Sequence, residues 1–104
     1  MKSNIVKDLE ICKDNIKILC LMNKKADATL NFCSDYAIPN IILDYKKFWK
    51  DYETEARLEV SLPFVIEKLL LVRSFHTEES EYIAIIDETI KILSEVNLNI
   101  NKKF

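Results

Sequence analysis

Few side chains in this 104-residue chain could do chemistry, and the single histidine is the first to consider. His76 stands between Phe75 and Thr77, at the junction of two expected helices. A catalytic triad or a zinc site needs partner side chains at defined spacings, and no Ser, Cys or acid stands at such a spacing from His76. We therefore expect His76 to have a structural or surface role.

The three cysteines are Cys12, Cys20 and Cys33, an odd number without a closely spaced pair. Metal sites use closer pairs and more ligands, whereas free cysteine is often buried as a small apolar side chain. The N-terminus lacks a basic region followed by an apolar run and a cleavage site. We expect reduced thiols in the core of a cytoplasmic protein, with no metal and no cofactor.

Acidic residues gather at one point, where Glu78, Glu79 and Glu81 follow Thr77. A pair of carboxylates could act as general acid and base. However, acids in the first turn of a helix are already explained by the helix dipole. We do not interpret this cluster as catalytic, and we expect no enzymatic activity.

Lysines alternate with aromatic residues in the segment 45–50, a pattern that resembles a stacking platform for single-stranded nucleic acid. At 100° per residue, however, Tyr45, Phe48 and Trp49 fall on one side of a helix and the lysines on another. Fifteen basic and seventeen acidic residues give a formal charge of -2. We therefore expect no direct nucleic-acid partner and, because no apolar run approaches the ~18 residues that span a bilayer, no membrane partner.

One charged edge is the best candidate for a binding site. Its acids, Asp44, Asp51, Glu55 and Glu59, follow steps of seven, four and four residues, which places them on one edge of a helix. This is either an ordinary solvated flank or an acidic surface for a basic protein, in which Tyr45, Trp49 and Tyr52 would be the anchors. Replacing Asp51 and Glu55 by lysine tests the binding role.

The elements that position these residues are predicted to be helices. Gly is absent, which disfavours tight hairpins and phosphate-binding loops. Apolar residues at helical spacing predict helices over 3–22, 26–36, 38–56, 62–75 and 77–96, with a polar, frayed tail over 97–104. The expected stripe of the first helix is Ile5, Leu9, Cys12, Ile16 and Leu19, and that of the last helix is Ile83, Ile86, Ile90 and Leu93.

Several helix ends are predicted from local signals. Ser3, Ser61 and Thr77 are expected N-caps, and Pro39 is expected to end the second helix near residue 38. The alternation over 58–62 resembles a strand, but a single strand has no partner, so we interpret it as a helix end and a connection. The additional apolar residues Ile18, Leu21 and Met22 predict that the end of the first helix is surrounded.

The expected architecture is therefore all-α: a compact bundle of four main helices plus one short helix, in a single domain over 1–104. Functionally we expect a non-catalytic protein-binding module. Its most concrete form is a small immunity protein or antitoxin that binds and blocks a basic toxin or nuclease domain.

Two other functions remain open. The chain could be a homodimeric regulatory or accessory protein of viral or plasmid origin, joined through apolar surplus on the helices over 3–22 and 62–75. It could also be an enzyme or small-ligand binder with a pocket around Trp49, Tyr52 and His76. A buried His76 beside two inward acids would favour the enzyme.

Overall fold

The structure is a computed structural model that describes residues 4–22, 28–48, 52–76, 78 and 80–101. These residues form helices and the turns that join them, and no strand occurs among them. In chain order the elements are α1 (Ile5–Met22), α2 (Ala28–Phe32), a π-helical turn (Cys33–Ala37), α3 (Ile38–Phe48), α4 (Tyr52–Ser74) and α5 (Ser80–Asn101). The predicted all-α bundle is confirmed.

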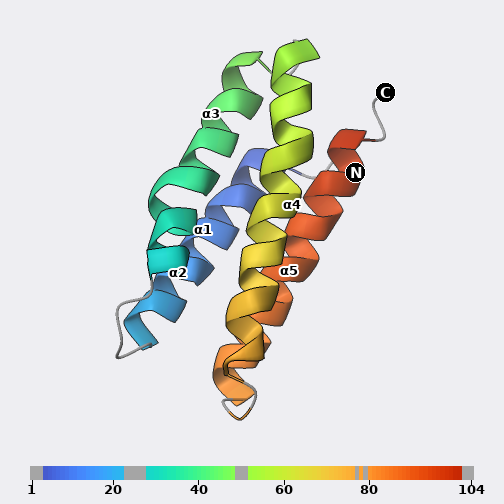
Figure 1. The fold of residues 1–104 in the computed structure, drawn as a ribbon. Coiled ribbons are helices and arrows are strands. Elements are labelled where there is room, and N and C mark those ends of the chain that lie inside the picture. Colours follow the sequence, from blue (N-terminus) through green and yellow to red (C-terminus); the bar gives the residue numbers. More distant parts are fainter. Residues whose placement is uncertain (1–3, 23–27, 49–51, 77, 79, 102–104) are drawn as a thin grey trace.

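The long helices are arranged as a ring, in which α1 and α4 each pack against both α3 and α5 (Figure 1). Consecutive long helices run in opposite directions, so neighbouring helices in the ring are antiparallel (Figure 1). The short α2 packs against α1 and α4. The α1–α5 pair and the α3–α4 pair, the latter extended by α2, therefore form opposite sides of the bundle.

The core is a single cluster, and in α1, α4 and α5 its side chains recur at alternating four- and three-residue steps, the spacing of helices that pack at shallow angles. Each fully buried Leu or Ile contributes about 1.5–3 kcal/mol relative to exposure. The buried positions are Ile5, Leu9, Cys12, Ile16 and Leu19 in α1, Leu58, Leu62, Val65, Leu69 and Val72 in α4, and Tyr82, Ile86, Thr89, Leu93, Val96 and Ile100 in α5.

The predicted stripe of α1 is confirmed, but the expectation that its end is surrounded is wrong. Ile18, Leu21 and Met22 are all exposed, and Leu21 keeps 87% of its surface. Among the described elements, α1 packs against α5, α3, α2 and the π-helical turn, and these contacts leave the three side chains exposed. The cap of α1 is Asn4, whose Oδ1 accepts the N–H of Lys7 at 3.0 Å; Ser3 lies outside the described residues.

The second and third helices are joined without a break. Ile38, which precedes Pro39, is helical with φ -69° and ψ -43°, so the predicted end near residue 38 is wrong. The π-helical turn explains this, because its Ile38 N–H bonds to the Cys33 carbonyl. The wider turn moves the preceding carbonyls away from the position where a proline ring clashes in an α-helix. A π-helical turn contains one residue more than an α-helical turn. This extra residue keeps Leu30, Cys33, Ile38 and Ile41 all on the buried side.

The helix predicted over 38–56 is in fact divided between two helices. α3 ends at Phe48 and α4 begins at Tyr52, antiparallel to α3. The expected connection over 58–62 is wrong as well, because these residues are helical and Leu58 and Leu62 are buried four residues apart. Ser61 therefore caps no helix, and its Oγ donates to the Arg57 carbonyl at 2.8 Å.

Pro63 stands inside α4, and its replacement is expected to be stabilising. Proline has no N–H to donate and its ring crowds the carbonyl four residues earlier. We expect Pro63→Ala to raise the free energy of unfolding by about 1–3 kcal/mol in denaturant titrations. Pro39→Ala is the matched control and should gain less, because Pro39 follows a turn that already accommodates it. A loss of stability in Pro63→Ala would show that the proline ring itself contributes to packing in the folded chain.

The last helix is longer than expected. α5 begins at Ser80, and Thr77, the predicted cap, lies outside the described residues. Ile86 and Leu93 are buried as predicted, whereas Ile83 and Ile90 are only half-buried. The helix continues to Asn101 because Ile100 is buried against the core, so the prediction of a frayed tail is wrong over 97–101.

A partly buried polar contact joins α1 to α5 and favours one register between them. Asn15 Nδ2 donates to Thr89 Oγ1 at 3.2 Å, and that hydroxyl donates to the Ile85 carbonyl at 2.8 Å. Cys12 Sγ makes a weak bond of 3.9 Å to the Thr89 carbonyl. Buried polar groups that are partnered in only one register favour that register.

Among the helices of the described ranges, none has the length and apolar character to cross a membrane.

Candidate functional site

The predicted acidic edge is not assembled as the sequence suggested. Asp44 lies on α3 and is half-buried, and its carboxylate accepts hydrogen bonds from Arg57 of α4. The Nε–Oδ2 and Nη2–Oδ1 distances are both 3.3 Å. Two parallel bonds of this kind hold a guanidinium and a carboxylate in one geometry. Asp44 therefore joins α3 to α4 and is already engaged within the chain.

The other predicted binding residues fall into three groups. Tyr45 is half-buried and packs against the core, whereas Glu59 is exposed on α4. Tyr52 and Glu55 belong to α4, but their side chains are not among those described. Trp49 and Asp51 lie outside the described residues. Because the edge is shared by two antiparallel helices, it is not one row of acids along a single helix.

The pocket suggested around Trp49, Tyr52 and His76 does not form. Tyr52 starts α4 and His76 follows its end, and α4 has 23 residues. A rise of 1.5 Å per residue separates them by ~35 Å. His76 is instead half-buried against Tyr82, with the ring centroids 4.3 Å apart.

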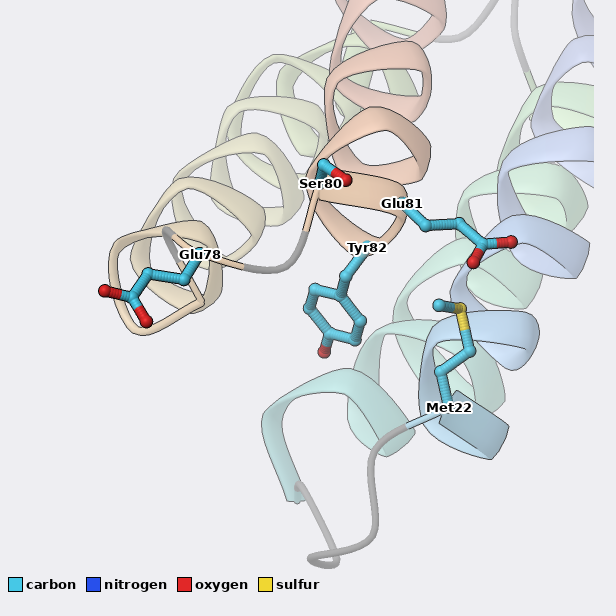
Figure 2. Close-up of a pocket in the computed structure, with 5 residues that line it drawn as sticks. All are labelled: Met22, Glu78, Ser80, Glu81 and Tyr82. Atoms are coloured by element: carbon cyan, nitrogen blue, oxygen red, sulfur yellow. The ribbon is translucent and has the colours of Figure 1, made fainter.

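A pocket of about 350 Å³ lies where the end of α1 meets the start of α5. Figure 2 shows Glu81 and Met22 pointing toward one another across it, with Tyr82 beside them and Glu78 pointing away. Glu78 and Glu81 are both exposed. Neither of these two acids is therefore buried beside His76. In the described parts of the chain, no group of three or more His, Cys, Asp or Glu could hold a metal ion.

The cysteines are free thiols with different surroundings. Cys12 and Cys33 are buried and Cys20 is half-buried. Burial raises the pKa of Cys12 from 9.0 to about 12, and the negative charges of Asp8 and Glu88 add to this. A thiol with so high a pKa stays protonated and is a poor nucleophile at neutral pH. The interpretation of Cys12 as a core side chain is confirmed.

An acidic surface does exist, but on the α1–α5 side of the bundle. We call it the acidic seam, and it consists of Asp8, Glu81, Glu88 and Glu95. The three glutamates recur every seven residues, and therefore lie on one side of α5. That side faces α1, because Asp8 and Glu88 both act on Cys12 and Glu81 lies against Met22. Within the described part of the chain, none of the four carboxylates lies in an ion pair.

Two exposed isoleucines of α1 provide apolar contact surface beside the acidic seam. Ile11 and Ile18 recur seven residues apart on α1, and both are exposed. Their side of α1 is the one that carries Asn15, which bonds to Thr89 of α5. Carboxylates beside exposed apolar side chains can attract a basic partner and also provide area to bury.

The opposite side of the bundle carries an apolar face, whose members are Phe32, Tyr36, Val60, Phe64, Leu71 and Phe75. Phe32 stacks on Tyr36 with centroids 5.9 Å apart and meets Phe64 edge-on at 6.0 Å. Lys68 Nζ lies 5.1 Å from the centre of the Phe64 ring. A groove of about 340 Å³ runs between α2 and α4 beside these rings.

Both surfaces were missed by the sequence reasoning. The seven-residue spacing of Glu81, Glu88 and Glu95 was a usable signal, but Glu81 was assigned to a helix-dipole cluster. Val60 was assigned to a connection, so the exposed apolar side of α4 was not predicted.

Comparisons of the chain with protein-family models, with curated proteins and with solved structures found no match.

Proposed function

We propose that this protein is a non-catalytic binding module, most concretely an immunity protein or antitoxin that blocks a basic toxin or nuclease domain. The observation that supports this best is the acidic seam beside the exposed Ile11 and Ile18. A nuclease binds a polyanion and therefore presents a basic channel. A row of carboxylates opposite that channel would speed encounter, and the isoleucines would be buried in the complex.

The position of the seam suits an inhibitor. It is formed by two long helices held in register by Asn15 and Thr89. A surface that is rigid before binding loses little conformational entropy on association, which favours tight complexes. An inhibitor needs only to cover the partner's channel, and no catalytic group is required.

Charge reversal tests the seam against the edge first predicted from the sequence. The two double variants are Glu88→Lys/Glu95→Lys and Asp51→Lys/Glu55→Lys, which change the net charge equally. The partner is first recovered with the tagged chain from its native host. The readouts are binding to that partner and protection from its toxicity. We expect the seam variant to bind at least ~10-fold more weakly and lose protection, because like charges then face each other. Binding of the native chain should weaken with salt.

The edge variant is the matched control and should keep both binding and protection. Loss in the edge variant alone would assign the site to the region of Asp51 and Glu55. Full activity in both variants would reject an electrostatic role for either surface.

A further inference from the structure

On the outer side of α4, two apolar residues and one charged residue follow each other with the same spacing from either end of the segment 60–75. Val60, Phe64 and Glu67 are spaced by four and three residues, and Phe75, Leu71 and Lys68 repeat this spacing in the reverse direction. The apolar members are exposed, with Val60 at 71% and Phe75 at 75%. All six positions lie within about a third of the helix circumference at 100° per residue.

We propose that two copies of this chain pack through the apolar face, with their α4 helices antiparallel and a twofold axis between Glu67 and Lys68. Val60 then contacts the partner's Phe75, and Phe64 contacts the partner's Leu71. Glu67 pairs with the partner's Lys68, and each contact occurs twice. This is the self-complementary interface that twofold symmetry requires.

Charge complementarity selects this pairing. Glu67 is exposed, and the Lys68 stem is half-buried with its ammonium above Phe64. In the antiparallel pair, both carboxylates meet ammonium groups. A parallel pair in register would place Glu67 against the partner's Glu67, which is repulsive.

The exposed area is sufficient for a stable dimer. Tyr36 is 63% exposed, and Phe32 and Leu71 are each about half exposed, so they add to the surface from α4. With ~150–250 Å² for each large side chain, the apolar face presents roughly 600 Å². A standard interface buries ~800 Å² per partner, of which little more than half is apolar.

The dimer does not depend on the proposed role as an inhibitor of a toxin or nuclease. The apolar face and the acidic seam lie on opposite sides of the bundle, so a dimer would leave both seams exposed. A partner could bind each seam without displacing the second copy.

The mass of the full chain in solution tests the dimer. Light scattering and sedimentation at micromolar concentration should give twice the 12.2 kDa of one chain. Leu71→Asp should give the monomer mass with unchanged helical circular dichroism, because Leu71 lies in the interface and not in the core. A native chain that is monomeric throughout this range would overturn the proposal.

Charge exchange tests the register of the pairing. Glu67→Lys and Lys68→Glu should each weaken the dimer at least ~10-fold, because each places like charges across the axis. Mixing these two single variants should restore a dimer, and so should the double exchange in one chain, since both arrangements bring opposite charges together. Failure of the mixture to associate would overturn this register.

Variants elsewhere separate this proposal from the proposed function. An equal mixture of Lys91→Glu and Glu95→Lys should remain as dimeric as the native chain, because both residues lie off the apolar face. The Glu88→Lys/Glu95→Lys chain should also keep the dimer mass. A monomeric native chain that still binds its basic partner would reject the dimer alone.

Discussion

Replacing Leu69 by alanine is expected to lower the free energy of unfolding by about 3 kcal/mol, within the ~2–5 kcal/mol of buried leucine truncations. Leu69 is fully buried in α4. The variant loses apolar contact area and leaves a cavity that packed neighbours fill only in part. Urea titration followed by circular dichroism measures the change.

The next residue provides a matched control in the same helix. Leu70 is half exposed, so Leu70→Ala should change the free energy of unfolding by no more than ~0.5 kcal/mol. Leu70 also lies outside the apolar face, so dimerisation should not mask the comparison. Equal losses in the two variants would contradict the orientation of α4 in the bundle.

The buried thiol of Cys12 is expected to make the protein less stable in alkaline solution. Its pKa is raised from 9.0 to about 12, mainly by burial. Between these values the unfolded chain releases the proton and the folded chain retains it, so stability falls as pH rises. The loss is about 1.4 kcal/mol per pH unit and about 4 kcal/mol in total by pH 12. Below pH 9 the contribution is fully present.

Comparison with Cys12→Ala isolates this contribution from other groups that titrate at high pH. The free energy of unfolding of both chains is measured at pH 7.5 and pH 10. The fixed cost of removing the side chain cancels, and the native chain should lose about 1.4 kcal/mol more than the variant over this interval. Parallel pH profiles would show that Cys12 is not buried as described.

Much of the core could be predicted because burial along a helix follows a regular spacing. All five residues of the α1 stripe are buried as predicted, as are Ile86 and Leu93 of α5. The burial of Thr89 was not predicted, because its side chain carries a polar hydroxyl. Its hydrogen bond from Asn15 on another helix makes its burial acceptable.

The candidate sites were harder to predict, since a surface depends on which helices lie beside one another. The acidic seam takes its residues from α1 and α5, which are far apart in the sequence. The edge centred on Asp44 assumed one helix across residues that the structure divides between α3 and α4. Asp44 turned out to bond Arg57, thirteen positions further along the chain.

The sequence by itself determined the helical character of the chain, the buried side of the first helix and part of the buried side of the last, because these follow from the local spacing of apolar residues. Only the tertiary structure decided where the chain reverses and which apolar residues remain uncovered. The apolar residues around position 50 have the same spacing whether they belong to one long helix or to two antiparallel helices. Leu21, Val60 and Phe75 are as apolar as their buried neighbours, and they are exposed because no other helix in the described ranges packs over them.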